Sequence, residues 1–99
     1  MNPMWLLHAV GPDDEALSFR LASDAVKTVG RAPRADFILD RPLVSRLHCR
    51  LEAAAGTLEV IDLSSTNGIY VNGARVSRQQ LAVGDILRVG RVELEIRRS

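Results

Sequence analysis

The sequence predicts an all-β protein, an antiparallel β-sandwich of about ten short strands. Apolar and polar residues alternate with a period of two in several segments, most clearly at residues 92–97. Turn signals recur every several residues, and the strongest is Asn72-Gly73 between two short apolar runs. Outside residues 43–55, no segment of any length has the spacing of a helix.

Short apolar or alternating runs predict the strands in chain order, at residues 4–10, 17–21, 26–29, 36–40, 57–62, 69–71, 74–76, 85–89 and 92–97. The first run is almost wholly apolar and is expected to be a buried strand, whereas the second alternates like a half-buried one. Ala55-Gly56 and Gly90-Arg91 are turn signals between later strands.

Residues 43–55 are compatible with a helix or a strand. Leu43, Leu47 and Leu51 recur every four residues and alanines follow, which is the pattern of a helix. From Leu47 to Ala53, small or apolar residues also alternate with polar ones, which is the pattern of a strand entered from a loop. Periodicity does not decide between them, and a strand is expected because the rest of the chain is built of strands.

Size and composition indicate one domain over residues 1–99, with a core of ordinary size. A net charge of +1 with 46% hydrophobic residues excludes a disordered chain and gives no support for bulk attraction to nucleic acid or membrane. The lone Cys49 cannot form an internal disulfide and is expected to be a packed structural thiol in a reducing compartment. Because the sequence has no bilayer-spanning run and no secretory signal pattern, a cytoplasmic location is expected.

Positive charge is concentrated in one part of the chain. Residues 30–50 carry a net charge of +3, against −2 for residues 1–29 and zero for residues 51–99. This excess favours an anionic ligand. Arginine outnumbers lysine twelve to one, which is typical of a GC-rich, bacterial genome.

Three short runs carry side chains suited to a phosphate group: Gly30-Arg31, Ser45-Arg46-Leu47-His48 and Ser65-Thr66-Asn67-Gly68. The arginines offer planar forks of N–H donors, the hydroxyl residues add further donors, and the asparagine amide both donates and accepts. Loops at one end of a sandwich can gather such runs into a shallow pocket of donors without an evident nucleophile. The matching ligand is a phosphate dianion with three strong acceptor oxygens.

These runs, in this order, resemble the signature of the forkhead-associated (FHA) domain family. The resemblance includes the longer run 62–73, which reads Asp-Leu-Ser-Ser-Thr-Asn-Gly-Ile-Tyr-Val-Asn-Gly, and the closing segment 81–90. It is strongest over residues 26–96, and it is specific because separate blocks occur together in the right order.

The resemblance implies an eleven-stranded sandwich whose loops at one end bind phosphothreonine in an extended peptide. The implied ligand contacts are Arg31, Ser45, Arg46, Thr66 and Asn67. The arginines and hydroxyl residues would hold the phosphate, and the asparagine would bond the peptide main chain. Supporting residues, implied to shape the loops rather than touch the ligand, are Gly30, His48, Asp62, Gly68, Asn72 and Gly73.

The expected partner is a phosphothreonine-containing protein or peptide, the substrate of a Ser/Thr kinase, with no cofactor, nucleic acid or membrane involved. The expected role is that of a non-catalytic adaptor. Residues flanking the phosphothreonine would be selected by the loops after Asp40 and after Gly68, with Ile69 and Tyr70 as candidates.

Other functions are considered from the same residues. Ser45, His48 and Asp62 are the residue types of a hydrolase triad, but no Gly-x-Ser-x-Gly turn surrounds the serine. Two histidines forty residues apart and one cysteine do not have the spacing of a zinc site, and no nucleotide-binding fingerprint is present.

The sequence also allows two other binding functions. A basic strip near the C-terminus could consist of Arg88, Arg91, Arg97 and Arg98. Interleaved carboxylates and few aromatic residues argue against nucleic acid as its ligand. The main rival is a scaffold of the same fold that binds a protein surface without phosphate.

Overall fold

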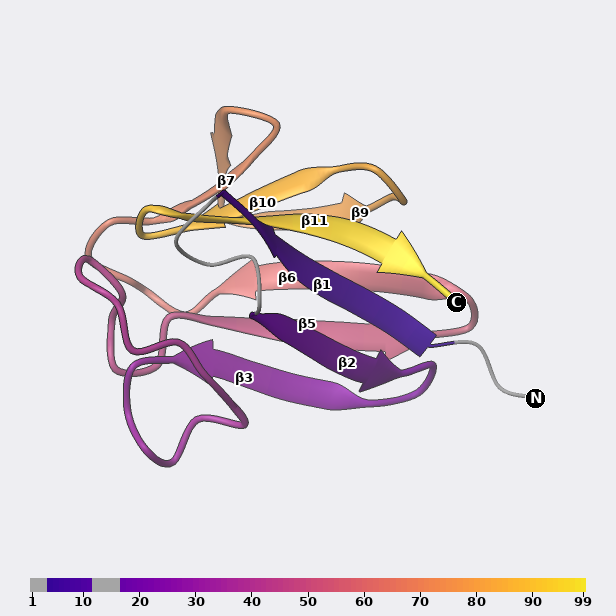
Figure 1. The fold of residues 1–99 in the computed structure, drawn as a ribbon, viewed down its shortest axis with the longest axis horizontal. Helices are drawn as coiled ribbons and strands as arrows, with labels where there is room; N and C mark the ends of the chain where they lie inside the picture. The colour runs from indigo at the N-terminus through magenta and orange to yellow at the C-terminus, as the bar shows by residue number, and fades with distance from the viewer. Residues whose placement is uncertain (1–3, 12–16) are drawn as a thin grey trace.

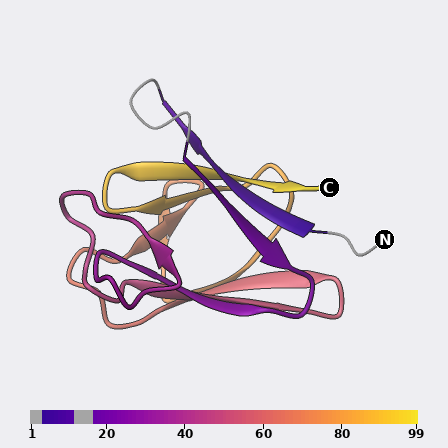
Figure 2. The ribbon, with the colours of Figure 1, turned by 60° about the horizontal axis from the view of Figure 1, so that its bottom comes forward.

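The computed structural model describes residues 4–11 and 17–99 of the chain. Within these residues eleven strands form two sheets that stack face to face as a β-sandwich, and none of them is helical (Figure 1 and Figure 2). The predicted fold class is confirmed. The described residues accordingly include no helix that could cross a membrane.

The larger sheet has the order β2-β1-β11-β10-β7-β8 within the described residues. Its strands are β1 (Met4–Val10), β2 (Ser18–Ala22), β7 (Ile69–Val71), β8 (Ala74–Val76), β10 (Ile86–Val89) and β11 (Val92–Arg98). The smaller sheet has the order β4-β3-β5-β6-β9. Its strands are β3 (Val26–Gly30), β4 (Phe37–Ile38), β5 (Cys49–Ala54), β6 (Thr57–Asp62) and β9 (Arg78–Leu81). In the described part of the chain only β3 and β4 pair in parallel.

Alternation along the strands decides which side chains fill the space between the sheets. In β11, Leu94 and Ile96 are fully buried while Glu93 faces solvent. At one edge of the sandwich, Phe19 of β2 stacks on Phe37 of β4, with ring centroids 4.7 Å apart. Since these two strands belong to different sheets, the aromatic pair holds the sheets together where no strand pairing can.

Apart from shifts of one residue at strand ends, the predicted strands differ from the observed ones in two places, and one ambiguous segment is resolved. Residues 43–55 contain β5, so the strand interpretation is confirmed there. The strand predicted at 36–40 is reduced to Phe37–Ile38, because the chain turns at Leu39, whose carbonyl accepts a hydrogen bond from the Arg41 N–H (3.0 Å). The sequence does not predict β9, because this edge strand buries only its last residue, Leu81, and has no apolar alternation.

Two stretches of loop gather at the end of the sandwich opposite the start of β1 and the C-terminus (Figure 1). They comprise residues 31–48, apart from the short β4, and residues 63–68. We call this region the loop end. It carries the three runs that the sequence marks as phosphate-binding.

Burial of Cys49 confirms the expected packed thiol and leads to a prediction for alkaline pH. Burial, aided by the charge of Asp62 in the neighbouring strand, raises the pKa of this thiol from 9.0 to about 12. In the unfolded chain the thiol ionises near its ordinary pKa. The thiol's contribution to stability is therefore complete below about pH 9 and is lost as the pH rises towards 12.

We expect the free energy of unfolding to fall more steeply with rising pH in the wild type than in Cys49→Ala. The extra slope above pH 9 should approach about 1.4 kcal/mol per pH unit. Urea denaturation of both proteins at about pH 8 and about pH 10.5 measures it. Identical losses in the two proteins would show that the buried thiol does not contribute.

Candidate functional site

His48 links the two stretches of the loop end. It is completely buried, and among the described residues it is the only polar side chain that is buried. Its Nδ1 accepts a hydrogen bond from the Ser45 main-chain N–H (3.0 Å), and its Nε2 lies 2.8 Å from the Gly68 carbonyl oxygen. A carbonyl can only accept, so the ring hydrogen is on Nε2 and the imidazole is neutral. His48 therefore joins residue 45 to residue 68 through one rigid ring.

This geometry does not form a hydrolase triad. Both ring nitrogens of His48 are bonded to main-chain groups, and neither is bonded to the Ser45 hydroxyl. The carboxylate of Asp62 accepts a hydrogen bond from the Ser65 hydroxyl instead (2.5 Å). The arrangement agrees with a bracing role for both residues and gives no support to a nucleophilic serine.

The loop 63–68 is shaped by a short relay of hydrogen bonds. Ser65 donates its hydroxyl to Asp62 and accepts a hydrogen bond from the Gly68 N–H (2.9 Å) on the same oxygen. The chain passes through positive φ at Ser64 (57°) and Gly68 (77°), which lets it curl tightly around this serine. The relay fixes the path of the main chain on either side of Thr66 and Asn67.

The segment 45–46 lies against the end of β3. The Arg31 N–H donates to the Ser45 carbonyl (2.9 Å), and the Ala32 N–H donates to the Arg46 carbonyl (3.0 Å). A side chain at Gly30 would overlap the Arg46 carbonyl oxygen, so only glycine permits this approach. The close approach brings the two arginines of the predicted site onto adjacent segments.

Arg31 and Ser45 are held so that donors remain free. The Arg31 Nε donates to the Val44 carbonyl (3.1 Å), which leaves both terminal amino groups of the guanidinium for a ligand. The Ser45 Oγ accepts a hydrogen bond from the Thr66 N–H (3.2 Å), so its own O–H can still donate. Both side chains are thus oriented by the loop before any ligand arrives.

Asn67 is oriented in the same way. Its Nδ2 donates to the Leu43 carbonyl (3.0 Å), which leaves Oδ1 and the second amide hydrogen for a ligand. An amide with both a donor and an acceptor free can pair with a peptide main chain. Leu43 itself has a positive φ of 70° and is 47% exposed beside the site.

The structure brings together four of the five predicted ligand contacts through these bonds: Arg31, Ser45, Thr66 and Asn67. The main chain of the fifth, Arg46, lies against Gly30, and its side chain is exposed. In the described part of the chain, no carboxylate forms an ion pair with Arg31 or Arg46. The loop end is a cluster of oriented donors.

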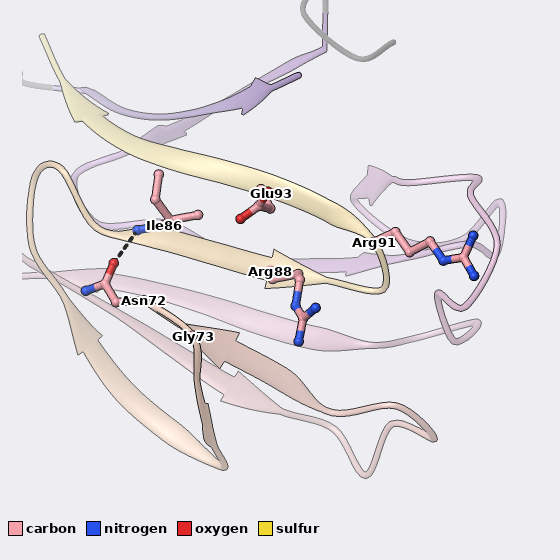
Figure 3. Close-up of a pocket in the computed structure, with 6 residues that line it drawn as sticks. All are labelled: Asn72, Gly73, Ile86, Arg88, Arg91 and Glu93. Carbon is pink, nitrogen blue, oxygen red and sulfur yellow. Dashed lines mark hydrogen bonds between the residues drawn. The ribbon is translucent and has the colours of Figure 1, made fainter. Parts of the chain in front are cut away.

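Two of the predicted supporting residues and one candidate for ligand selection do not lie at the surface of the loop end. Asn72 and Gly73 form the turn at the far end of β7, where Asn72 bonds the Asp85 carboxylate (3.0 Å) and the Ile86 N–H (2.9 Å), the latter shown in Figure 3. They support the β7–β8 hairpin, with no direct bond to the loop end. Ile69 is fully buried, so its candidacy for contact with ligand residues is wrong; it belongs to the core because its neighbour Tyr70 takes the outward position.

Sequence reasoning missed the role of Ser65 and of two main-chain carbonyls. The spacing Asp62-x-x-Ser65, followed by Gly68, was the available signal for the hydrogen-bond relay. Nothing in the sequence marks the carbonyls of Leu43 and Val44 as the groups that orient Asn67 and Arg31.

The alternative sites gain no support from the described residues. They contain no group of histidine, cysteine or carboxylate side chains that could hold a metal ion. The C-terminal arginines do not form one strip, because Arg97 pairs with Glu95 (2.7 Å) and Arg98 lies over the Trp5 ring. Arg98 and Arg91 lie towards opposite ends of β11.

Comparison with known proteins gives the family. The family model of the FHA domain matches residues 27–90. The chain belongs to the FHA-domain family. The match begins in β3, includes the whole loop end and stops after β10.

Relatives and solved structures agree with this assignment. The FHA domain is 38% identical to an oxoglutarate dehydrogenase inhibitor of Corynebacterium efficiens over 74 residues. The aligned residues make up 75% of this chain and 52% of that protein. The chain thus spans about half the length of this curated relative.

Two solved structures have the same fold along most of their length. One comes from work on phosphothreonine-dependent FHA domain interactions (32% identity, TM-score 0.85, 95% of each chain). The other is the FhaA FHA domain complexed with the intracellular domain of Rv3910 (33% identity, TM-score 0.84, 94% of this chain and 99% of that one).

The chain offers a matched test of the His48 link, since its only other histidine, His8, is half-buried on the outer face of β1. We expect His48→Ala to lower the free energy of unfolding by about 2–5 kcal/mol, because it leaves a cavity and two unpaired main-chain groups. His8→Ala should change it by less than about 1 kcal/mol. Urea denaturation measures both, and equal effects would contradict the bridging role.

Proposed function

We propose that this FHA domain binds phosphothreonine in an extended segment of a partner protein, as a non-catalytic adaptor in Ser/Thr-kinase signalling. One observation carries the proposal. Arg31, Ser45 and Asn67 each use part of their hydrogen-bonding capacity to be fixed in place by the loops, and each keeps the rest for a ligand. Such preorganisation suits the reversible binding of an anion.

The phosphate would be held by charge-assisted hydrogen bonds. The two terminal amino groups of Arg31 match two phosphate oxygens, and the Ser45 O–H reaches a third acceptor position. Arg46 and the Thr66 hydroxyl add a second positive charge and a further donor. Each such bond contributes about 1.5–3 kcal/mol, so a few of them account for micromolar affinity, about −8 kcal/mol.

The peptide main chain would be read by Asn67. Its free Oδ1 accepts from a ligand N–H, and its remaining amide hydrogen donates to a ligand carbonyl. Because these groups lie beside the phosphate donors, a phosphorylated residue in an extended segment satisfies both at once. A free phosphate ion would pair with the phosphate donors but not with the Asn67 amide.

The family relationship supports the same class of ligand. A domain of the same fold, 32% identical, comes from work on phosphothreonine-dependent interactions. The partner would be a protein phosphorylated on threonine by a Ser/Thr kinase. A cytoplasmic location is part of the proposal and rests on the single buried thiol, which suits a reducing compartment.

Calorimetric titration with phosphothreonine, phosphoserine and unphosphorylated versions of one peptide tests the proposal. We expect binding of the phosphothreonine version, weaker binding of the phosphoserine version and none of the third. Arg31→Ala should weaken binding by about 2–5 kcal/mol, because the phosphate loses its bidentate partner. Arg20→Ala is the control, since Arg20 is exposed on β2, outside the loop end.

Two outcomes would contradict this function. Equal affinity for the phosphorylated and unphosphorylated peptides would favour the scaffold that binds without phosphate. Equal losses in Arg31→Ala and Arg20→Ala would show that net charge, rather than the loop end, holds the ligand.

Binding should also depend on pH through the ligand. The second ionisation of a phosphothreonine has a pKa near 6, and the dianion is the better acceptor. We expect affinity to fall as the pH decreases through about 6, by several-fold between about pH 7 and about pH 5. The same titration at several pH values measures this. An affinity that stays constant over this range would show that the charge of the dianion is not what the site recognises.

A further inference from the structure

A row of outward-facing side chains crosses the larger sheet close to the loop end. The strand register places Arg75 of β8 opposite Tyr70 of β7, and Tyr70 opposite Arg88 of β10. The Arg88 guanidinium lies over the Tyr70 ring, 4.1 Å from its centroid. Arg91 follows at the turn between β10 and β11. We call Arg75, Arg88 and Arg91 the arginine row.

Both ends of the arginine row adjoin the loop end. The Arg75 guanidinium lies against Gly68, where a Cβ would come within 2.5 Å of its Nε. Gly68 directly follows Asn67, the residue proposed to bond the ligand main chain. At the other end of the row, Gly90 packs against residues 42–44, with a Cβ position 3.1 Å from the Pro42 carbonyl oxygen. Arg91 is therefore next to the loop that carries Leu43.

The arginine row lacks the carboxylate partners that arginines have elsewhere in the domain. Arg50, Arg78 and Arg97 each form an ion pair with a glutamate at 2.7–2.9 Å. Among the described residues no such pair involves a member of the row. The three guanidinium groups therefore keep most of their N–H donors for an external acceptor.

Glu93 is the carboxylate of the neighbouring strand, and it forms no ion pair with any described arginine. It lies opposite Arg88 in the register of β10 and β11. In Figure 3 the Arg88 guanidinium turns away from Glu93 and towards β7, and Arg91 projects from the turn. Together with Asn72, Gly73 and Ile86, these residues line a hollow of about 560 Å³. The hollow gives a ligand side chain room to approach Arg88 and Arg91.

We propose that the arginine row binds acidic side chains beside the phosphothreonine, so that the preferred ligand is an acidic phosphopeptide. This rests on the proposed function, because the phosphate places the peptide at the loop end. A chain leaving Asn67 advances about 3.3–3.6 Å per residue and reaches the row within a few residues. Aspartate or glutamate at these positions finds unpaired guanidinium groups, with bidentate geometry available.

The experiment compares phosphothreonine peptides that differ only in three flanking residues, aspartate in one version and asparagine in the other. One pair of peptides carries them on the N-terminal side of the phosphothreonine and a second pair on the C-terminal side. On one side, we expect the aspartate version to bind about three- to tenfold more tightly, the size expected for a few partly exposed ion pairs. On the other side, the two versions should bind alike.

Variants then locate the effect. Arg75→Gln and, separately, Arg91→Gln should reduce the aspartate-to-asparagine affinity ratio towards one. Arg20→Gln removes the same charge from the outer face of the same sheet, on β2, and should leave the ratio at its wild-type value. Arg91 lies on an exposed turn, so its variant tests the proposal even if Arg75→Gln disturbs Gly68.

Each adverse outcome has a distinct meaning. Equal affinities of the aspartate and asparagine versions on both sides, with phosphate-dependent binding intact, overturn this inference alone. A preference present on both sides, or lost equally in Arg20→Gln, attributes it to net charge and also overturns the inference. A loss in Arg75→Gln that is identical for both versions assigns Arg75 to the loop rather than to acidic residues. Absence of phosphate-dependent binding in every peptide refutes the proposed function itself.

Discussion

The candidate site depends on one buried imidazole. His48 bonds the Ser45 N–H on one side and the Gly68 carbonyl on the other, so the two stretches of the loop end share a rigid support. A buried polar group is stable only when its hydrogen bonds are made, and here each bond is to a main-chain atom of a different loop. Moving either loop would leave one ring nitrogen unpaired. The stability of the core and the shape of the site are thereby coupled.

Because His48 fixes the main chain of both stretches, main-chain groups of the loop end can hold the exposed side chains of the site in place. The carbonyls of Leu43 and Val44 hold Asn67 and Arg31, and the Thr66 N–H holds the Ser45 hydroxyl. Long side chains fixed in this way lose little entropy when a ligand binds, so a small contact area is sufficient for useful affinity. The same bonds occupy the carbonyls of Leu43 and Val44, so the groups left free for a ligand are mostly donors.

Much of this could be predicted from the sequence, and the parts that could not have physical causes. Period-two alternation predicts β11, and Asn72-Gly73 predicts the β7–β8 turn, because local geometry determines both. The polar strand β9 could not be predicted from the sequence, because it has no apolar alternation and forms only by pairing with β6. Residue types predict an anion-binding role for Arg31 and Ser45, whereas the groups that orient them, such as the Val44 carbonyl, are brought to them only by folding.

The distribution of charge on the surface is the clearest case of a property that the sequence alone does not predict. Residues 51–99 are neutral as a sequence, which suggests a surface without preference for either sign. In the folded domain Arg78 pairs with Glu59 of the neighbouring strand, and Arg97 pairs with Glu95 within β11. Arg88 lies opposite both Tyr70 and Glu93, and its guanidinium lies over the Tyr70 ring. Folding therefore sorts an even mixture of charges into a paired region and an unpaired one. Because the unpaired arginines lie beside the loop end, the positive field of residues 30–50 continues onto a segment whose net charge is zero.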